Sequence, residues 1–288
     1  MKVQEILDRT IQFFRDKKLD SPRLDAELLI SRALGYRRID LYLKFDQPLA
    51  EADVVKCREV VRRRSQGEPV AYILGEKDFY GLTFQVDSRV LVPRPETEML
   101  AEAALEVLGK LPKEDALEVL DLGSGSGCLG LTLATKTPNA RVTMVDLSEQ
   151  ALQVAQGNAE KLGVANRCDW LLGDAAEVDL QSKVFDLIVA NPPYIANNDP
   201  RVQASVAQFE PHLALYANEG GFSAIQSWAR HSVRNLKPGG WIGFEFGIDQ
   251  DQLAKELFTS LGLTDVKIIV DLSGLPRHVV GRKGSNHG

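Results

Sequence analysis

Residues 117–128 read Leu-Glu-Val-Leu-Asp-Leu-Gly-Ser-Gly-Ser-Gly-Cys, an apolar run that ends in alternate glycines. The run 117–122 has the length and composition of a strand buried on both faces. Glycines after such a strand allow the backbone to approach a ligand at the N-terminus of the next helix. The dinucleotide fingerprint G-x-G-x-x-G would need glycine at position 128, where this chain has Cys128. The segment therefore predicts a strand, a ligand-binding turn and a helix, with a turn unlike that of dinucleotide-binding proteins.

The same alternation of strand and helix continues along the rest of the chain. Further strands are expected at 140–146, 168–173, 184–190 and 240–246, and helices near 127–136, 148–163, 220–236 and 250–261. This pattern predicts a doubly wound α/β fold, with a mostly parallel sheet and helices on both faces. The last two strands, near 265–271 and 276–282, are expected to form an antiparallel edge. In the strand order 3-2-1-4-5, the strands 117–122 and 184–190 are neighbours at the switch point, where ligands bind.

Polar or small residues follow three successive predicted strands. The turn after the first strand consists of Gly123, Ser124, Gly125, Ser126 and Gly127. Asp146 ends the second strand, where a carboxylate can bind both hydroxyls of a ribose. Asp174 and Ala175 follow the third strand, where an adenine amino group would lie. Any one of these acids could be an exposed loop residue, but the three strand ends together predict a cofactor site.

Asn191-Pro192-Pro193-Tyr194 follows the predicted strand 184–190. Each proline restricts φ and lacks an N–H, so the backbone leaves the sheet stiff and extended. By itself, such a sequence usually indicates a turn with a capping asparagine. Beside a cofactor site it predicts a substrate pocket, formed by all four residues, for a flat group that bears N–H donors. The Asn191 side-chain oxygen and the Pro192 carbonyl could accept both hydrogens of an amide, and Tyr194 could pack against its plane.

These motifs resemble those of a known enzyme family. The alternate glycines resemble the first motif of S-adenosylmethionine-dependent methyltransferases, and Asn191–Tyr194 resembles the signature of methyltransferases that act on planar nitrogens in adenine or glutamine. The whole chain resembles the HemK-type protein-(glutamine-N5) methyltransferases, which modify peptide chain release factors. The resemblance includes Leu-Val-Pro-Arg-Pro-Glu-Thr-Glu at 91–98 and Phe-Glu-Pro at 209–211. Many relatives carry a large aromatic residue beside the adenine-binding acid, where this chain has Ala175.

The resemblance implies a Rossmann-like methyltransferase domain that uses S-adenosyl-L-methionine and releases S-adenosyl-L-homocysteine. It implies methylation of the glutamine in the Gly-Gly-Gln loop of release factors, and hence a cytoplasmic protein. The implied catalytic residues are Asn191, Pro192 and Tyr194. The implied cofactor-binding residues are Gly123, Ser124, Gly125, Ser126, Gly127, Asp146, Asp174, Ala175 and Asn191. Alternatives are glutamine methylation of a ribosomal protein, adenine methylation of nucleic acid, and a cofactor-binding regulator without turnover, which an intact acceptor pocket disfavours.

Outside this catalytic region the sequence predicts two further parts. Residues 1–75 have helical periodicity and are expected to form an all-α domain that recognises the partner, and residues 76–94 a β-hairpin linker before a catalytic domain at 95–288. The basic cluster 62–64 indicates either a solvated helix face or a docking site for an acidic protein or RNA. Glu96 and Glu98 begin a helix, where carboxylates are favoured on electrostatic grounds as readily as for catalysis.

Composition limits the classes of partner. The 288 residues carry a net charge of −6, which argues against a surface that neutralises many phosphates, so direct nucleic-acid binding is not expected. Three cysteines and four histidines are scattered without metal-ligand spacing, so no metal is expected. No apolar run is long enough to span a bilayer, so no membrane association is expected.

Overall fold

The computed structural model describes residues 1–112, 114–197 and 199–285. The chain forms two compact units, one comprising Met1–Glu76 with Gln203–Phe209 and the other Lys77–Val202 with Glu210–Gly288. The short segment Gln203–Phe209 lies inside the range that the sequence analysis assigns to the catalytic domain, yet it packs with the first unit. Among the described residues, no helix is both long and apolar enough to cross a membrane.

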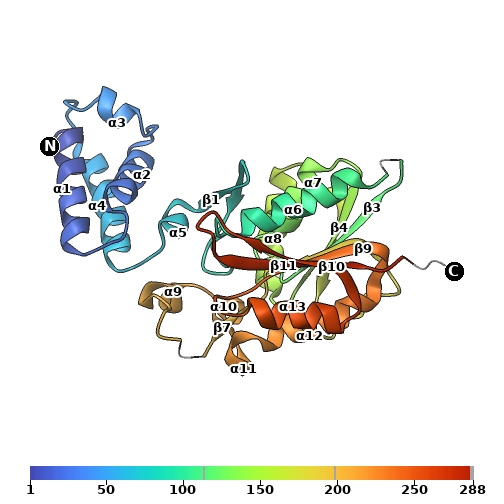
Figure 1. The fold of residues 1–288 in the computed structure, drawn as a ribbon. Helices are drawn as coiled ribbons and strands as arrows, with labels where there is room; N and C mark the ends of the chain where they lie inside the picture. Colours follow the sequence, from blue (N-terminus) through green and yellow to red (C-terminus); the bar gives the residue numbers. More distant parts are fainter. Residues whose placement is uncertain (113, 198, 286–288) are drawn as a thin grey trace. The chain divides into compact units, whose positions relative to one another are not determined.

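The first unit is a small helical bundle (Figure 1). Its helices are α1 (Val3–Asp16), α2 (Pro22–Leu34), α3 (Asp40–Leu43), α4 (Glu51–Ser65), α5 (Val70–Leu74) and α9 (Ala204–Phe209). Pro22 occupies the first turn of α2, and Gly35 ends that helix in the left-handed conformation with φ of 67°. The helices enclose a core that includes Val3, Phe14 and Leu29, all fully buried.

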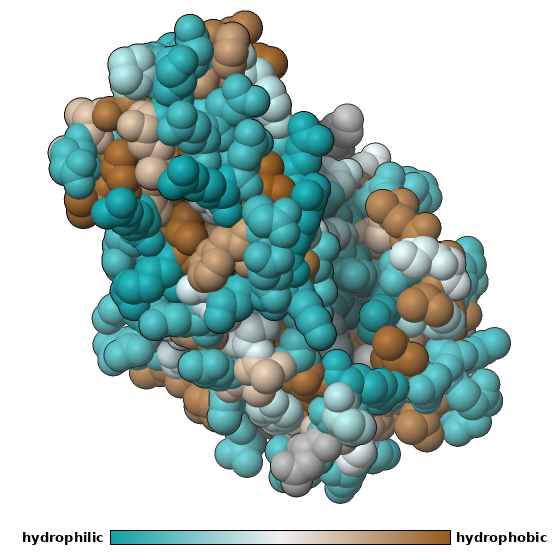
Figure 2. Space-filling model, turned by 90° about the vertical axis from the view of Figure 1, so that its left-hand side faces the viewer, coloured by the Kyte–Doolittle hydropathy of each residue, from teal (hydrophilic) through white to brown (hydrophobic). Residues whose placement is uncertain are grey.

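The basic cluster at the end of α4 is paired with carboxylates of the same unit. Arg62 pairs with Glu59, Arg63 pairs with Glu68, and the Arg64 Nε lies 2.8 Å from an Asp25 carboxylate oxygen. Arg64 and Asp25 are largely buried, so this pair holds α4 against α2. Hydrophilic residues cover most of the face seen in Figure 2, with hydrophobic residues scattered between them. These ion pairs favour a structural role for the basic cluster over a docking site for an acidic protein or RNA.

The second unit contains a seven-stranded sheet in the order β10-β11-β9-β6-β3-β4-β5. The strands are β3 (Leu117–Leu122), β4 (Ala140–Asp146), β5 (Cys168–Leu172), β6 (Phe185–Ala190), β9 (Leu236–Glu245), β10 (Leu263–Val270) and β11 (Pro276–Lys283). The pairs from β9 through β5 are parallel, whereas β11 runs antiparallel to both β9 and β10. The predicted doubly wound sheet, with β3 and β6 adjacent at the switch point and an antiparallel edge, is therefore confirmed.

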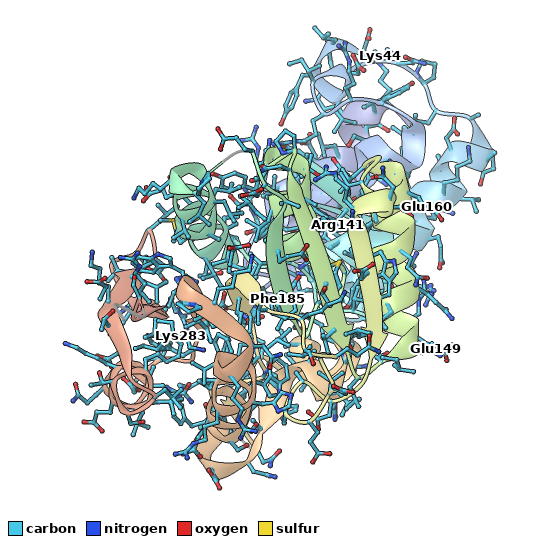
Figure 3. The ribbon with its side chains drawn as sticks, turned by 90° about the vertical axis from the view of Figure 1, so that its right-hand side faces the viewer. Lys44, Arg141, Glu149, Glu160, Phe185 and Lys283 are labelled. Atoms are coloured by element: carbon cyan, nitrogen blue, oxygen red, sulfur yellow. The ribbon has the colours of Figure 1, made fainter. Side chains whose placement is uncertain are left out.

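Helices cover both faces of this sheet (Figure 1). One face packs against α6 (Thr97–Lys110), α7 (Cys128–Lys136) and α8 (Glu149–Lys161), and the other against α12 (Ser223–Ser232) and α13 (Asp251–Ser260). Figure 3 shows Phe185, which is fully buried, inside these layers, whereas Glu149 and Glu160 point outward from α8. Burial of both faces explains why the central strands are continuously apolar.

The segment before α6 differs in part from the predicted hairpin. Strands β1 (Glu76–Phe79) and β2 (Leu82–Gln85) form a two-stranded hairpin, turned by Tyr80 and Gly81 with φ of 49° and 73°. Positive φ at both turn residues matches the twist of the two strands. The alternation of apolar residues continues to Val92, but from 86 to α6 the chain is irregular, with Val90 and Val92 buried.

The chain after β6 contains short elements that the sequence analysis does not predict. Besides α9, they are β7 (Ile195–Ala196), α10 (His212–Leu215), β8 (Tyr216–Ala217) and α11 (Asn218–Gly221), together with the 3-10 turns η1 (Ala165–Arg167) and η2 (Val233–Asn235) of the second unit. β7 and β8 pair in parallel as a separate two-stranded sheet. β7 begins directly after Tyr194, so this small sheet continues from the Asn191–Tyr194 segment.

Candidate active site

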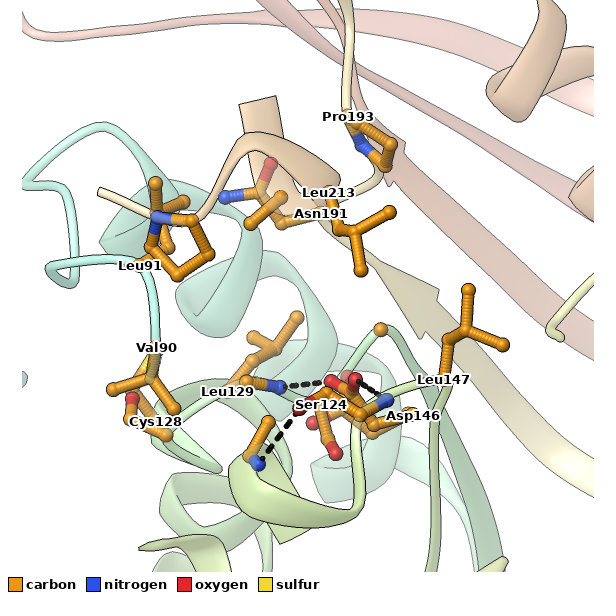
Figure 4. A pocket seen from close by; sticks show the side chains of 18 of the residues that line it. Val90, Leu91, Ser124, Cys128, Leu129, Asp146, Leu147, Asn191, Pro193 and Leu213 are labelled. Carbon is orange, nitrogen blue, oxygen red and sulfur yellow. Dashed lines mark hydrogen bonds between the residues drawn. The ribbon is translucent and has the colours of Figure 1, made fainter. Parts of the chain in front are cut away.

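A pocket opens at the carboxyl ends of β3, β4 and β6. Together with its open mouth, the pocket encloses about 1110 Å³. Residues from the strand ends that line it are Asp121, Gly123, Ser124, Gly125, Ser126, Asp146, Asp174, Ala175, Asn191 and Pro193. In Figure 4, Asn191 and Pro193 lie on one side, with Ser124 and Asp146 opposite. The structure thus brings most of the predicted cofactor residues, together with Asn191 and Pro193 of the predicted substrate residues, to one pocket.

The glycine-rich turn is held in a conformation that other residues rarely adopt. Gly123, Gly125 and Gly127 have φ of 68°, 53° and 80°. A Cβ on Gly123 would lie 2.7 Å from the Trp228 ring, and a Cβ on Gly127 would lie 2.7 Å from Leu131. Gly127 does not line the pocket; it starts α7 as its N-cap residue. Trp228, which lines the pocket from α12, is absent from the sequence-based assignment because no local motif marks it.

Two hydroxyl groups in this turn are buried without a protein partner. No described residue forms a hydrogen bond with the Oγ of Ser124 or of Ser126. Buried polar atoms are nearly always satisfied in native proteins, so each exception needs a partner such as an ordered water or a ligand. The two serines therefore support the prediction that the turn binds a polar ligand.

Asp146 is positioned by backbone groups on either side of it. Its Oδ2 accepts a hydrogen bond from Gly125 N at 2.8 Å, and its Oδ1 accepts one from Ser148 N at 2.9 Å. Burial raises the pKa of the Asp146 carboxyl above its ordinary value. Because each carboxylate oxygen can accept a second hydrogen bond, both oxygens remain able to bind vicinal hydroxyls. Asp174 and Ala175 form the neighbouring wall, with Ala175 almost fully buried.

Asp121 is a second buried carboxyl group in the pocket, and the sequence analysis does not assign it a role. Its side chain is 1% exposed, and its Oδ2 accepts a hydrogen bond from Gly130 N at 2.8 Å. Burial, with a smaller contribution from the charge of Asp146, raises the pKa of Asp121 to about 7. Its signal in the sequence is an acid near the end of a largely apolar strand, two residues before Gly123 of the glycine-rich turn.

Asn191–Tyr194 is divided between the pocket and the protein interior. Asn191 and Pro193 line the pocket, whereas Pro192 is buried and neither it nor Tyr194 is among the lining residues. The Tyr194 hydroxyl donates to Glu245 Oε1 at 2.9 Å. Burial and the neighbouring Glu245 raise the pKa of Tyr194 well above its ordinary value, so the phenol stays protonated. Contact between the Tyr194 ring and a substrate amide remains a prediction.

The Asn191 side chain is fixed by α6. Its Nδ2 donates to the Thr97 hydroxyl at 3.1 Å, and Thr97 Oγ1 donates to Glu245 Oε2 at 2.7 Å. Thr97 lies between the two acids of the 91–98 motif, and it is this residue that reaches the pocket. Glu96 and Glu98 do not line the pocket, and Glu98 accepts a hydrogen bond from Tyr80 N at 3.0 Å. The structure therefore assigns neither acid to the site.

Two motifs named in the sequence analysis contact each other beside the pocket. Arg94 Nη2 lies 2.7 Å from Glu210 Oε1, and Val92 N donates to Glu210 Oε2 at 3.1 Å. The Glu210 side chain is only 1% exposed. A buried carboxylate with both oxygens bonded fixes the segment 92–94 against 210–211, and Pro93, Arg94 and Pro211 then form part of the pocket wall.

The backbone after Pro193 is held by a close approach at Gly221. Gly221 has φ of 89°, and a Cβ there would lie 2.1 Å from the Tyr194 carbonyl oxygen. Gln250 Nε2 donates to the carbonyl oxygens of Tyr194 and Gly220 at 3.2 and 3.3 Å. These contacts pack α11 against the end of the Asn191–Tyr194 segment.

We expect Gly221→Ala to destabilise the protein by about 1–3 kcal/mol, because the new methyl group collides with backbone and the residue is strained at positive φ. Thermal unfolding checks this, and the midpoint should fall by several degrees. The control is Gly109→Ala in α6, where a Cβ meets no atom within 4 Å and no loss is expected. Equal midpoints for Gly221→Ala and the wild type would contradict the close approach.

The described residues contain no group of three or more His, Cys, Asp or Glu side chains that could hold a metal ion. The Cys128 thiol lies at the pocket, where burial raises its pKa to about 12, which keeps it protonated. The polar side chains that line the pocket carry hydroxyl, amide, carboxylate and guanidinium groups, which can bind and orient a ligand.

Two protein-family models match this chain. Residues 5–75 match the family model described as PrmC N-terminal domain, and residues 99–240 match the Methyltransferase small domain. Among solved structures, the catalytic domain of hMettl16 in complex with a MAT2A 3'UTR hairpin has a TM-score of 0.59 at 15% identity, over 75% of this chain and 82% of that one. That likeness shows the fold alone.

Curated relatives are similar along almost the whole chain. A release factor glutamine methyltransferase of Chlorobaculum tepidum is 43% identical over 96% of this chain and 95% of its own length. A protein of the same description from Koribacter versatilis is 39% identical over 98% of this chain and 99% of its own. Both family models and both relatives match this chain, and its two-unit fold and shared pocket are consistent with them. This chain therefore belongs to the release factor glutamine methyltransferase family.

Proposed function

We propose that this protein transfers a methyl group from S-adenosyl-L-methionine to the side-chain amide nitrogen of the glutamine in the Gly-Gly-Gln loop of peptide chain release factors. The observation that carries the proposal is the position of Asn191, whose side chain lines the same pocket as the glycine-rich turn. No described residue donates a hydrogen bond to its Oδ1. An acceptor oxygen is thus left for a substrate N–H.

The pocket residues fit the methyl donor. Asp146 suits the ribose hydroxyls, and the orphaned hydroxyls of Ser124 and Ser126 suit the polar parts of the ligand. Asp121 suits the positively charged amino group of its methionine part, and Asp174 and Ala175 suit the adenine edge. When bound, S-adenosyl-L-methionine supplies an electrophilic methyl group on a sulfonium sulfur.

The residues of the chain contribute orientation. An amide nitrogen is a weak nucleophile because its lone pair is delocalised into the carbonyl. Asn191 Oδ1 and the Pro192 carbonyl would accept the two amide hydrogens and direct the nitrogen toward the donor, without a strong base in the pocket. Correct placement of reacting atoms can account for a large part of a barrier, and preorganised polar groups add to it.

The direct test offers the purified protein a radiolabelled methyl donor with three acceptors side by side: release factor, ribosomal protein and DNA. We expect label in the release factor only, and none when its Gly-Gly-Gln glutamine is replaced by alanine. Label in the ribosomal protein or DNA at a comparable rate would instead favour the alternative substrates.

The raised pKa of Asp121 predicts a pH dependence of cofactor binding. The carboxylate form binds a cation, so affinity should increase as pH rises through about 7. Between pH 6 and pH 8 the ionised fraction of such a group changes about tenfold, and calorimetry with S-adenosylhomocysteine should show a similar gain. Asp121→Asn should remove most of this dependence. A wild-type affinity that is flat over this range would contradict the role.

We also propose that residues 1–75 recognise the protein substrate and take no part in the chemistry, and that the enzyme acts in the cytoplasm, where release factors work. A chain lacking 1–75 should bind S-adenosylhomocysteine normally and methylate a short Gly-Gly-Gln peptide at the full-length rate. Its KM for whole release factor should rise about tenfold or more, because one of the two contact surfaces is lost. Unchanged KM for release factor would contradict the assignment.

A further inference from the structure

We infer that Glu245 and Thr97 lock the Asn191 side chain with its oxygen toward the acceptor pocket, and that this lock makes the site select a neutral amide against a carboxylate. The inference rests on the proposed function and names two positioning residues for it. Neither belongs to the Asn191–Tyr194 motif. Thr97 comes from the start of α6 and Glu245 from the end of β9.

The direction of each hydrogen bond follows from the chemistry of the groups. A carboxylate has acceptors only, so the Thr97 hydroxyl, 2.7 Å from Glu245 Oε2, must donate its single proton to it. The Thr97 oxygen then has only lone pairs to offer, and the Asn191 group 3.1 Å away must be the Nδ2 donor. The oxygen of the same amide consequently points away from Thr97.

The Glu245 carboxylate is itself held on both oxygens. Tyr194 donates to Oε1 at 2.9 Å, and Thr97 donates to Oε2 at 2.7 Å. Thr97 and Glu245 are each 1% exposed, so water does not compete for these bonds. Pairing of Ala190 with Phe244 across β6 and β9 brings Glu245 next to Asn191, which makes the lock a consequence of strand register.

This orientation decides which side chains the pocket accepts. Under the proposed function, the Asn191 oxygen and the Pro192 carbonyl accept the two hydrogens of a glutamine amide. A glutamate side chain is isosteric but presents only lone pairs of its own and a negative charge. If the Asn191 amide could turn over, its NH₂ group would bind that carboxylate. The lock therefore rejects glutamate as well as orienting glutamine.

A pair of substitutions at Thr97 separates the lock from simple packing. Thr97→Val keeps the volume and removes the hydroxyl, whereas Thr97→Ser keeps the hydroxyl and removes the methyl group. We expect Thr97→Val to lower kcat by about tenfold or more and Thr97→Ser to stay within about threefold of wild type. Both should bind S-adenosylhomocysteine as the wild type does. A packing role predicts the reverse order, and that result would overturn the inference.

Inhibition by a Gly-Gly-Glu peptide tests the selectivity directly. The wild type and Thr97→Ser should bind this peptide weakly, and Thr97→Val should bind it about tenfold more tightly, because the freed amide can present its NH₂ group. Unchanged inhibition across the three proteins would overturn the selectivity. In the Asn191→Ala background, Thr97→Val should cause no further loss of single-turnover rate, and a full additional loss would show that Thr97 acts elsewhere.

A readout without substrate distinguishes failure of the inference from failure of the proposed function. In ¹⁵N NMR spectra of the full-length protein, the Asn191 side-chain NH₂ protons should exchange slowly with water in the wild type and in Thr97→Ser. They should exchange much faster in Thr97→Val. Equal exchange in all three proteins overturns the lock, whereas slow exchange in a protein that fails to methylate release factor overturns only the function.

Discussion

Replacing Asn191 with alanine is expected to slow methyl transfer to release factor by about 10²-fold or more, while affinity for S-adenosyl-L-methionine stays within a few-fold of wild type. The side chain lines the pocket and offers Oδ1 as an acceptor, so its removal takes away one preorganised polar contact with the reacting amide. Loss of turnover with retained binding is the signature of an interaction made mainly in the transition state.

Asn191→Asp should be damaging as well, although aspartate and asparagine serve almost equally as loop caps. The Thr97 hydroxyl accepts from Asn191 Nδ2 and donates its only proton to Glu245. A carboxylate at position 191 would therefore meet only the lone pairs of the Thr97 oxygen. The added charge would also stabilise the sulfonium of the donor in its ground state, whereas transfer disperses that positive charge. A 10²-fold loss is therefore expected here too.

Single-turnover kinetics and a cofactor titration on both variants check this prediction. The matched control is Asn197→Ala, a few residues along the same loop, whose Nδ2 bonds to Asn218 and which does not line the pocket. It should turn over normally. Near-normal turnover in Asn191→Ala would reduce Asn191–Tyr194 to a structural turn and would remove the main support for the substrate assignment.

Asp146→Ala is expected to weaken S-adenosylhomocysteine binding by roughly 1.5–3 kcal/mol, or about ten- to 150-fold. Two effects contribute. The ribose loses a charge-assisted, two-point contact, and Gly125 N loses the acceptor that holds the glycine-rich turn in place at 2.8 Å. Asp146→Asn should lose less, because the amide oxygen can still accept from Gly125 N while its NH₂ group disturbs the second contact.

Calorimetry measures both variants. Asp169→Ala on the neighbouring strand β5 is the matched control, because its carboxylate pairs with Lys183 at the surface and does not line the pocket. It should bind the ligand as the wild type does. If Asp146→Ala also bound the ligand unchanged, Asp146 would be a loop-forming residue and the ribose would lie elsewhere.

Much of the fold is predictable from local pattern. Short apolar runs such as 117–122 and 184–190 are typical of strands in a parallel sheet covered on both faces, and the structure confirms both as central strands. The short elements between 195 and 221 escape prediction because they are two to six residues long. Their conformation depends on tertiary contacts such as Gly221 against Tyr194.

The sequence by itself determined the strand order, the shared pocket and most of its polar wall, since these depend on motifs that are contiguous in the chain. Only the tertiary structure decided how Asn191 is oriented. Thr97, Asn191 and Glu245 are far apart in the chain, and nothing in the segment around any one of them indicates that it contacts the other two. They meet because α6 packs on the sheet and because the register of β6 with β9 places Glu245 beside Asn191. The buried Glu245 carboxylate accepts the Thr97 proton, and the Thr97 oxygen therefore accepts from the Asn191 amide. No local pattern in the sequence contains that information.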